Sequence, residues 1–395
     1  MSLKKYFILS GLDLRDNNRG TAALGYGAFS FLRERGYIDD DSRMLAVMSS
    51  GRPFRRKTSG QKTGKSIVQE IQVGSHKYYK ETVIVPWWQW VLYRLTSHTL
   101  PFTKFRRVME QFAFVAAING GDGFSDIYDT ATFHMRLPEI LKAMRIKKPV
   151  ILLPQTLGPF KDPENAALAK KILRYASAIY VRDDNFIKEL DRMELKYEQT
   201  NDLSYYMKPE PWDIEIDTPN AIGINVSGLA YSNTFRTLAG QFSAYPELID
   251  RLITHFQAKG KTVYLIPHSY HFGKPEKSND DVEACQLAYD RLQNKDRVVF
   301  INKDLISPQV KYLISRMSFF CGTRMHANYA AIFTKVPLFG FAYSYKFKGA
   351  FERNGIFNRT AMINNITTDQ IDGIIHQVEV AYQEDVVQKR AKGVF

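Results

Sequence analysis

Short apolar runs and amphipathic stretches alternate along the first half of the chain. Short apolar runs are typical of buried strands, and an apolar period of three to four residues is typical of helices. The runs predict strands at Tyr6–Ser10, Met44–Met48, Phe112–Ile118, Val150–Leu153 and Ile179–Val181. The periodic stretches predict helices at Ala22–Arg35, Asp129–Met144, Pro163–Ala176 and Asp183–Leu190. Such alternation favours a parallel sheet covered by helices on both faces.

The alternation resumes after a proline-rich passage from Met207 to Pro219, which we interpret as a linker between domains. Beyond it, strands are expected at Ala221–Asn225, Thr262–Ile266, Val298–Ile301, Phe319–Cys321 and Val336–Phe341. Helices are expected at Pro246–Lys259, Asp281–Leu292, Pro308–Met317 and Met325–Phe333. The C-terminal half therefore repeats the architecture of the N-terminal half.

The fold predicted from this pattern is α/β, with two doubly wound, Rossmann-like domains facing a cleft, as in the GT-B architecture. A chain of 395 residues is long for a single core, and the domains are expected to be 1–212 and 213–395. Ligands of open α/β sheets bind outside the carboxyl ends of the strands. Candidate functional residues are therefore sought in the loops that follow each strand.

Composition narrows the class of protein further. Hydrophobic residues at 45% and charged residues at 24% are typical of a globular chain rather than a disordered one. No stretch approaches the roughly 20 apolar residues of a membrane-spanning helix. The cysteines, Cys285 and Cys321, are too few for a disulfide framework or a zinc site, so we expect a cytoplasmic protein.

The net charge of +13 would suit an anionic substrate, an anionic membrane surface or nucleic acid. The residues from about 50 to 107 read as an irregular insertion that is both basic and aromatic. Three tryptophans, Trp87, Trp88 and Trp90, lie there among clusters of lysine and arginine. Such a segment is typical of a peripheral membrane contact, but a buried aromatic cluster beside a solvated basic loop explains it equally well.

The segment Gly322-Thr323-Arg324-Met325-His326 follows an apolar strand and opens a predicted helix. Threonine is a favoured N-cap residue, so Thr323 is expected at the cap and Arg324 and His326 in the first turn. Free N–H groups and the helix dipole attract an anion to such a turn. The alternative is structural, with Arg324 paired to a carboxylate and His326 packed.

Two loops in the first half carry further candidates. Glycines at 120, 121 and 123 would let the backbone approach a ligand, and Asp122 or Asp126 could take a proton from a hydroxyl of that ligand. A simple tight turn is the alternative, and the pattern does not choose between the two acids. Arg182 follows a strand directly and either contacts a ligand or pairs with a carboxylate.

His268 also follows a predicted strand, with His271, Asp280 and Asp281 downstream. The spacing matches no common metal motif, so we expect no metal and a ligand-contacting role for His268.

An ordered set of motifs resembles the polysaccharide pyruvyl transferase family. The resemblance covers nearly the whole chain except residues 50–107. Its C-terminal part is Ser307–Gly355, with the Gly322–Ala327 turn and Tyr343-Ser344-Tyr345-Lys346. The remaining motifs are Asn18-Arg19-Gly20, where Thr21 replaces the acid usual in the family, Gly120–Asp126, Gln155-Thr156-Leu157-Gly158-Pro159-Phe160 and Arg182-Asp183.

The resemblance implies transfer of pyruvate from phosphoenolpyruvate to two hydroxyls of a sugar in a cell-surface or exopolysaccharide glycan, as a cyclic ketal. Phosphoenolpyruvate would be a co-substrate, with no cofactor and no nucleic-acid partner. The acceptor would be a glycan, carried on a polyprenyl diphosphate at the inner membrane face. The N-terminal domain would bind the acceptor and the C-terminal domain the donor.

Roles for individual residues follow from the resemblance together with the patterns. His326 and Asp122 are the predicted catalytic pair. The predicted donor-binding residues are Arg324, Lys346, Arg182, Thr323 and His268. The predicted acceptor-binding residues are Gly121, Asp126 and Gln155. Two other functions stay open, a GT-B glycosyltransferase that uses a nucleotide-sugar and a noncatalytic protein that binds anionic glycans.

Overall fold

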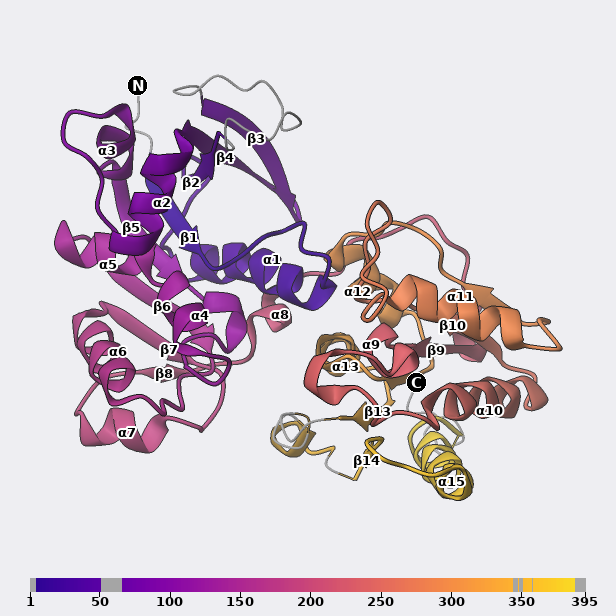
Figure 1. Cartoon of the computed structure of the whole chain (residues 1–395). Helices are drawn as coiled ribbons and strands as arrows, with labels where there is room; N and C mark the ends of the chain where they lie inside the picture. Colours follow the sequence, from indigo (N-terminus) through magenta and orange to yellow (C-terminus); the bar gives the residue numbers. More distant parts are fainter. Residues whose placement is uncertain (1–4, 51–65, 344–346, 348–350, 357, 388–395) are drawn as a thin grey trace. The chain divides into compact units, whose positions relative to one another are not determined.

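The structure is a computed structural model that describes residues 5–50, 66–343, 347, 351–356 and 358–387 (Figure 1). Two compact units divide the chain. The first comprises Met1–Leu14 and Leu24–Met207, and the second comprises Arg15–Ala23 and Lys208–Phe395. A short N-terminal segment therefore belongs to the C-terminal unit, whereas the sequence indicated one boundary between residues 212 and 213.

The N-terminal unit is built on a largely parallel sheet with the strand order β3-β4-β2-β1-β5-β6-β7-β8. The strands are β1 (Tyr6–Ser10), β2 (Arg43–Ser49), β3 (Ser66–Val73), β4 (His76–Val85), β5 (Phe112–Ala117), β6 (Val150–Gln155), β7 (Ala178–Val181) and β8 (Glu198–Gln199). The helices are α1 (Arg19–Glu34), α2 (Trp87–Thr96), α3 (Lys104–Met109), α4 (Thr130–Met135), α5 (Pro138–Arg145), α6 (Pro163–Tyr175), α7 (Ile187–Arg192) and α8 (Leu203–Tyr206).

Both faces of this sheet are covered. Ile8 of β1 points into a core shared with Tyr93 of α2 and Ile140 of α5. Its neighbour Phe7 points to the other face, where its ring meets Phe29 of α1 at 5.9 Å in an edge-on contact. Alternating side chains that are both buried are characteristic of a parallel sheet between two helical layers.

The predicted irregular insertion is wrong where the structure describes it. β3 and β4 form an antiparallel hairpin whose second strand pairs with β2, and the turn between them is Gly74-Ser75. Gly74 has a φ of +59°, which suits the tight turn of a two-residue hairpin. The basic residues at 51–65 lie outside the described part of the chain.

The C-terminal unit contains a parallel sheet with the strand order β11-β10-β9-β12-β13-β14. The strands are β9 (Ala221–Asn225), β10 (Thr262–Leu265), β11 (Val298–Phe300), β12 (Phe319–Gly322), β13 (Leu338–Ala342) and β14 (Thr360–Met362). The helices are α9 (Gly228–Ser232), α10 (Tyr245–Ala258), α11 (Asp281–Arg291), α12 (Ser307–Ser315), α13 (Met325–Phe333) and α15 (Ile371–Tyr382).

Successive residues of β12 again point to opposite faces. Phe319 and Cys321 pack in a core with α10, α11 and α15. Phe320 packs in a second core with α12 and α13. The expected pair of doubly wound α/β domains is thereby confirmed.

Candidate functional site

Asp281 lies at the centre of the loops that follow β9, β10 and β12 in the C-terminal unit. It is fully buried and begins α11, directly after the N-cap residue Asp280. Its Oδ1 accepts the backbone N–H of Gly228 at 2.8 Å. Its Oδ2 accepts the backbone N–H groups of His268 and Ser269, each at 2.9 Å. One carboxylate therefore holds the loops after two strands in place.

Arg324 connects the third loop to the same carboxylate. Its Nη2 donates to Asp281 Oδ1 at 2.6 Å and its Nε donates to the same oxygen at 3.2 Å. The residue is buried, and although desolvation opposes the shift, the Asp281 charge raises the pKa of Arg324 above its usual value. Nη2 also donates to Asn279 Oδ1 at 2.7 Å. Within the described residues, no hydrogen bond is made by Nη1, so that edge of the guanidinium can still donate.

The expected bounds of the helix that carries His326, Met325–Phe333, are confirmed, but its N-cap lies one residue later than predicted. Arg324, not Thr323, is the N-cap residue of α13, with φ −85° and ψ 133°, and its side chain makes no cap hydrogen bond. Its backbone N–H donates to Asn225 Oδ1 at 2.8 Å, at the end of β9. Thr323 is fully buried and shares a 2.7 Å hydrogen bond with the Tyr245 hydroxyl. The loop after β12 is therefore fixed by side chains from β9 and α10 as well as by Asp281.

His326 is the second residue of α13 and lies against Gly20. A Cβ atom added to Gly20 would lie 2.6 Å from His326 Nδ1 and 2.7 Å from its Cβ and Cγ. Real Cβ contacts are not this short, so only glycine lets the backbone at position 20 approach this ring. The ring also makes an edge-on contact with Tyr329 at 5.7 Å.

His268 is 4% exposed in the loop after β10. Within the described part of the chain, its Nδ1 has no hydrogen-bond partner. Desolvation, reinforced by the charges of His326, Arg324 and Arg19, holds the pKa of His268 well below its usual value. The sequence-predicted residues His268, Thr323, Arg324 and His326 thus come together at the carboxyl edge of one sheet.

Arg19 also lies at the carboxyl edge of this sheet, and the sequence predicted no role for it beyond its place in the Asn18-Arg19-Gly20 motif. Its backbone N–H donates to the His268 carbonyl at 2.9 Å, and its Nε donates to Leu305 O at 2.7 Å. Its guanidinium lies over the Tyr270 ring at 4.2 Å and pairs with Asp304 at 2.7 Å. The resemblance of Asn18-Arg19-Gly20 to a family loop was the signal that could have identified Arg19 as a site residue. The sequence did not indicate that this loop belongs to the C-terminal unit.

The remaining predicted residues lie in the N-terminal unit. Gly121 has a φ of +92°, and Asp122 accepts a hydrogen bond from the Tyr128 hydroxyl at 2.8 Å. Gln155 is buried and its Nε2 donates to Ala117 O at 2.9 Å. Arg182 is buried and pairs with Asp202 at 2.6 Å. Arg182 therefore belongs to the other unit from Arg324 and His268.

Asp126 is also buried, and its carboxylate accepts the backbone N–H groups of Lys161 and Asp162 and the side-chain amide of Asn165. Desolvation opposes the shift, but these hydrogen bonds hold the pKa of Asp126 below its usual value. Its present partners lie in the loop before α6 and in the first turn of that helix, and its predicted acceptor role stays a prediction. Lys346 lies outside the described residues.

The described residues contain no group of three or more His, Cys, Asp or Glu side chains placed to hold a metal ion. They also contain no helix that is long and apolar enough to cross a bilayer.

The two doubly wound α/β domains belong to the GT-B type of fold. The sequence model of the polysaccharide pyruvyl transferase family matches residues 18–345, and the chain belongs to that family. It is similar to the amylovoran biosynthesis protein AmsJ of Erwinia amylovora, with 19% identity over 74% of this chain and 71% of that protein.

The fold is similar to that of UDP-GlcNAc 2-epimerase from Methanocaldococcus jannaschii, with a TM-score of 0.50, 10% identity and coverage of 94% of this chain and 92% of that chain. UDP-GlcNAc 2-epimerase from Neisseria meningitidis matches with a TM-score of 0.49, 12% identity and coverage of 96% and 95%. At 10% identity the likeness to the Methanocaldococcus jannaschii structure shows the fold alone.

Proposed function

We propose that this transferase moves the pyruvyl group of phosphoenolpyruvate onto two hydroxyls of one sugar in a cell-surface or exopolysaccharide glycan. The observation that carries the proposal is the cluster of Arg324, His326 and His268 at the carboxyl edge of the C-terminal sheet, inside the segment that matches the family. The name of the similar AmsJ protein, which refers to biosynthesis of an exopolysaccharide, supports this acceptor class. Phosphoenolpyruvate would serve as co-substrate, without a cofactor.

The reaction requires one proton on carbon and two new carbon–oxygen bonds. An acid protonates the methylene carbon of phosphoenolpyruvate, which becomes a methyl group and leaves the adjacent carbon electrophilic. One sugar hydroxyl adds to that carbon and loses its proton. The second hydroxyl displaces phosphate and passes its proton to a base, so that a cyclic ketal and inorganic phosphate are the products.

In this proposal each residue has the role that the sequence predicted for it. The free Nη1 edge of Arg324 would donate to the donor's carboxylate or phosphate, because Asp281 already holds the other edge. His326 would be the acid, His268 and Thr323 would contact the donor, and Asp122 would accept a hydroxyl proton. Lys346 and Arg182 keep their predicted donor roles, and Gly121, Asp126 and Gln155 keep their predicted acceptor roles, without a further structural argument.

The test combines donor binding with turnover. Phosphoenolpyruvate should raise the melting temperature of the wild-type protein, and nucleotide-sugars should not. His326→Gln retains a hydrogen-bonding side chain but cannot protonate carbon, so phosphate release with a glycan acceptor should fall by about 10²–10⁴-fold while donor stabilisation persists. His98→Gln, at an exposed position of the N-terminal unit, is the matched control. Wild-type turnover in folded His326→Gln would remove this residue from the mechanism.

We also propose that the protein acts in the cytoplasm, at the inner membrane face, on a glycan carried by a polyprenyl diphosphate. Trp88, Leu95 and Phe102 are 47%, 79% and 99% exposed, in and just after α2. Exposed cations, Lys104, Arg106 and Arg107, follow directly in α3. Apolar side chains beside cations suit an interface with anionic lipid.

Sedimentation with vesicles of phosphatidylcholine and phosphatidylglycerol tests the membrane proposal. The wild-type protein should sediment with the anionic vesicles, and the Leu95→Ser, Phe102→Ser double variant should remain in the supernatant. Leu287→Ser removes a similarly exposed leucine from α11 and should sediment normally. Equal recovery of all three proteins in the supernatant would favour the packing alternative.

A further inference from the structure

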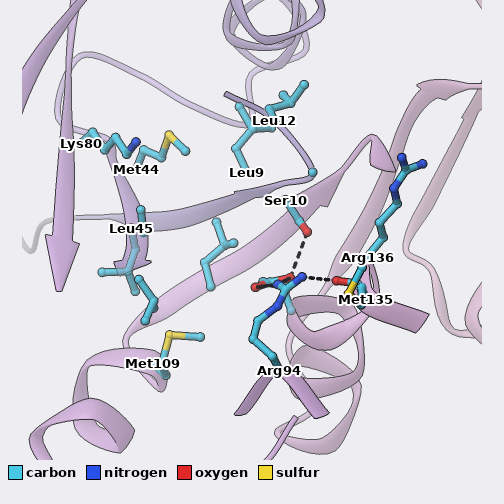
Figure 2. A pocket seen from close by; sticks show the side chains of 15 residues that line it. Leu9, Ser10, Leu12, Met44, Leu45, Lys80, Arg94, Met109, Met135 and Arg136 are labelled. Carbon is cyan, nitrogen blue, oxygen red and sulfur yellow. Dashed lines mark hydrogen bonds and ion pairs between the residues drawn. The ribbon is translucent and has the colours of Figure 1, made fainter. Parts of the chain in front are cut away.

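A pocket of about 330 Å³ lies within the N-terminal unit, and none of the candidate site residues predicted from the sequence lines it (Figure 2). Ser10, Gly11 and Leu12, at the carboxyl end of β1, form one wall. In the strand order, β1 has β2 on one side and β5 on the other, so the connection reverses direction at this strand. Doubly wound sheets bind their ligands at such a reversal.

Glu139 of α5 supplies the central polar group of the pocket. Its Oε2 accepts the Ser10 hydroxyl at 3.2 Å, and its Oε1 accepts Nη1 of Arg94 at 3.1 Å. Arg94 also donates to the Met135 carbonyl, as Figure 2 shows. A carboxylate has about four lone-pair positions, so Glu139 can accept further hydrogen bonds from a ligand. The side chain is 18% exposed, which leaves it accessible from the pocket.

The rest of the lining is mostly apolar, and Lys80 and Arg136 add two cationic side chains. Met44 and Met109 are buried and present thioether side chains, which adapt to irregular ligand surfaces. Lys80 lines the pocket and makes no ion pair within the described residues. Arg136 donates to Asn119 O at 2.8 Å, in the glycine-rich loop after β5.

These features favour a neutral, hydroxyl-bearing ring over a free anion. Lys80 and Arg136 also line the pocket, and Arg136 already donates to Asn119 O. The Glu139–Arg94 pair is neutral as a unit, and its carboxylate would repel a phosphate or carboxylate placed beside it. A carboxylate beside a guanidinium offers an acceptor and a donor to two adjacent hydroxyls, and the methionines offer an apolar surface to the C–H face of the ring. The volume is at the lower end of the roughly 300–1,000 Å³ found for small-molecule sites.

We infer that this pocket is an acceptor subsite additional to the predicted acceptor residues Gly121, Asp126 and Gln155, and that it binds a neutral hexose unit, with Glu139 and Arg94 on adjacent ring hydroxyls. This inference rests on the proposed function, since it names the place where the acceptor glycan of that reaction is held. Arg94 belongs to α2, the tryptophan-rich helix, so that helix would contribute both to the pocket and to the proposed membrane contact.

Ligand-observed NMR on the full chain tests the inference without any turnover. The probes are the methyl pyranosides of glucose, galactose and mannose, and inorganic phosphate. At least one hexoside should bind the wild-type protein at millimolar concentration, and Glu139→Gln should weaken that binding by at least tenfold. Leu12→Trp fills the pocket without removing a charge and should abolish hexoside binding. This variant tests the inference even if Glu139→Gln does not fold.

Asp250→Asn is the matched control, because Asp250 pairs with Arg291 in a cavity of the C-terminal unit. Its hexoside binding should equal that of the wild type. Hexoside binding that is unchanged in both pocket variants, or absent for all three sugars up to about 50 mM, overturns the inference. The change in melting temperature with phosphoenolpyruvate is measured on the same proteins. A protein that binds a hexoside but is not stabilised by phosphoenolpyruvate would contradict the proposed donor and not the acceptor pocket.

Discussion

Replacing Asp281 by asparagine removes one charge from the centre of the C-terminal site and keeps the side-chain shape. The carboxylate accepts five hydrogen bonds at 3.2 Å or less, three from Gly228 and Arg324 on Oδ1 and two from His268 and Ser269 on Oδ2. An asparagine must point its NH₂ group toward one of these two sets. At least two donors then face another donor, whichever way the amide turns.

The magnitude follows from the bonds that are lost. Two hydrogen bonds to a charged group are worth about 1.5–3 kcal/mol each, and breaking a buried ion pair costs about 3–5 kcal/mol. We therefore expect Asp281→Asn to lower the free energy of unfolding by at least about 3 kcal/mol. For a domain of this size, that corresponds to a fall of roughly 6–12 °C in melting temperature. Because Arg324 also loses its anchor, stabilisation by phosphoenolpyruvate should disappear.

Differential scanning calorimetry of the full chain measures the effect. Asp290→Asn is the control on the same helix, since Asp290 is 58% exposed and only 4.0 Å from Lys295, and it should change stability by less than about 0.5 kcal/mol. Combining Asp281→Asn with Arg324→Met removes the orphaned cation, so the double variant should be less unstable than the sum of the two single variants. A melting temperature for Asp281→Asn equal to that of Asp290→Asn would refute the reasoning.

Three further predictions concern other parts of the structure. Gly20→Ala should displace the His326 ring and lower the rate of phosphate release at least tenfold. Gly373→Ala, on α15 with no atom near the added Cβ, should leave the rate unchanged. Equal rates for the two variants would contradict the close contact between Gly20 and His326. Because the pKa of His268 is lowered in the folded state, the unfolded chain binds more protons below about pH 6.5, and stability should fall as the pH drops, by up to about 1.4 kcal/mol per unit. Chemical denaturation should show this slope in the wild type and a shallower one in His268→Gln. The pKa of Asp126 is lowered in the folded state, so its carboxylate stabilises the fold at a pH above about 4, the pKa of aspartate in the unfolded chain, and this stabilisation is lost as the pH falls. Asp126→Asn should therefore lower the free energy of unfolding at pH 7 and lower it much less near pH 3.

The sequence predicted best those elements whose signal is local. β9 and α13 are confirmed at both ends, because each is an apolar segment with a clear polar or glycine boundary. The single helix expected over 129–144 is wrong, since the structure has two helices and Pro138 begins the second of them. The β3–β4 hairpin was missed because β3 is mostly exposed and lacks an apolar run. The buried run Val83-Ile84-Val85 at the end of β4 and the Gly74-Ser75 turn were usable signals.

The candidate site was predictable only in part, for a physical reason. His268, Arg324 and His326 each follow a strand, and parallel strands bring their carboxyl ends to one edge of a sheet. The central role of Asp281 depends on contacts with residues 12 to 53 positions away. No local pattern distinguishes such a carboxylate from an ordinary acid in the first turn of a helix.

Because residues 15–23 belong to the C-terminal unit, that unit is not encoded by one continuous stretch of the gene. A fragment that begins at Lys208 would lack the Arg19 guanidinium that covers Tyr270 and bonds to Leu305, and it would leave the His268 carbonyl without its donor. During synthesis these nine residues are made before the N-terminal unit is complete, and they gain their partners only after the chain beyond Lys208 has followed. The C-terminal unit is thus completed by a segment that lies between two parts of the N-terminal unit in the chain, and expression of residues 208–395 alone requires residues 15–23 to be supplied with them.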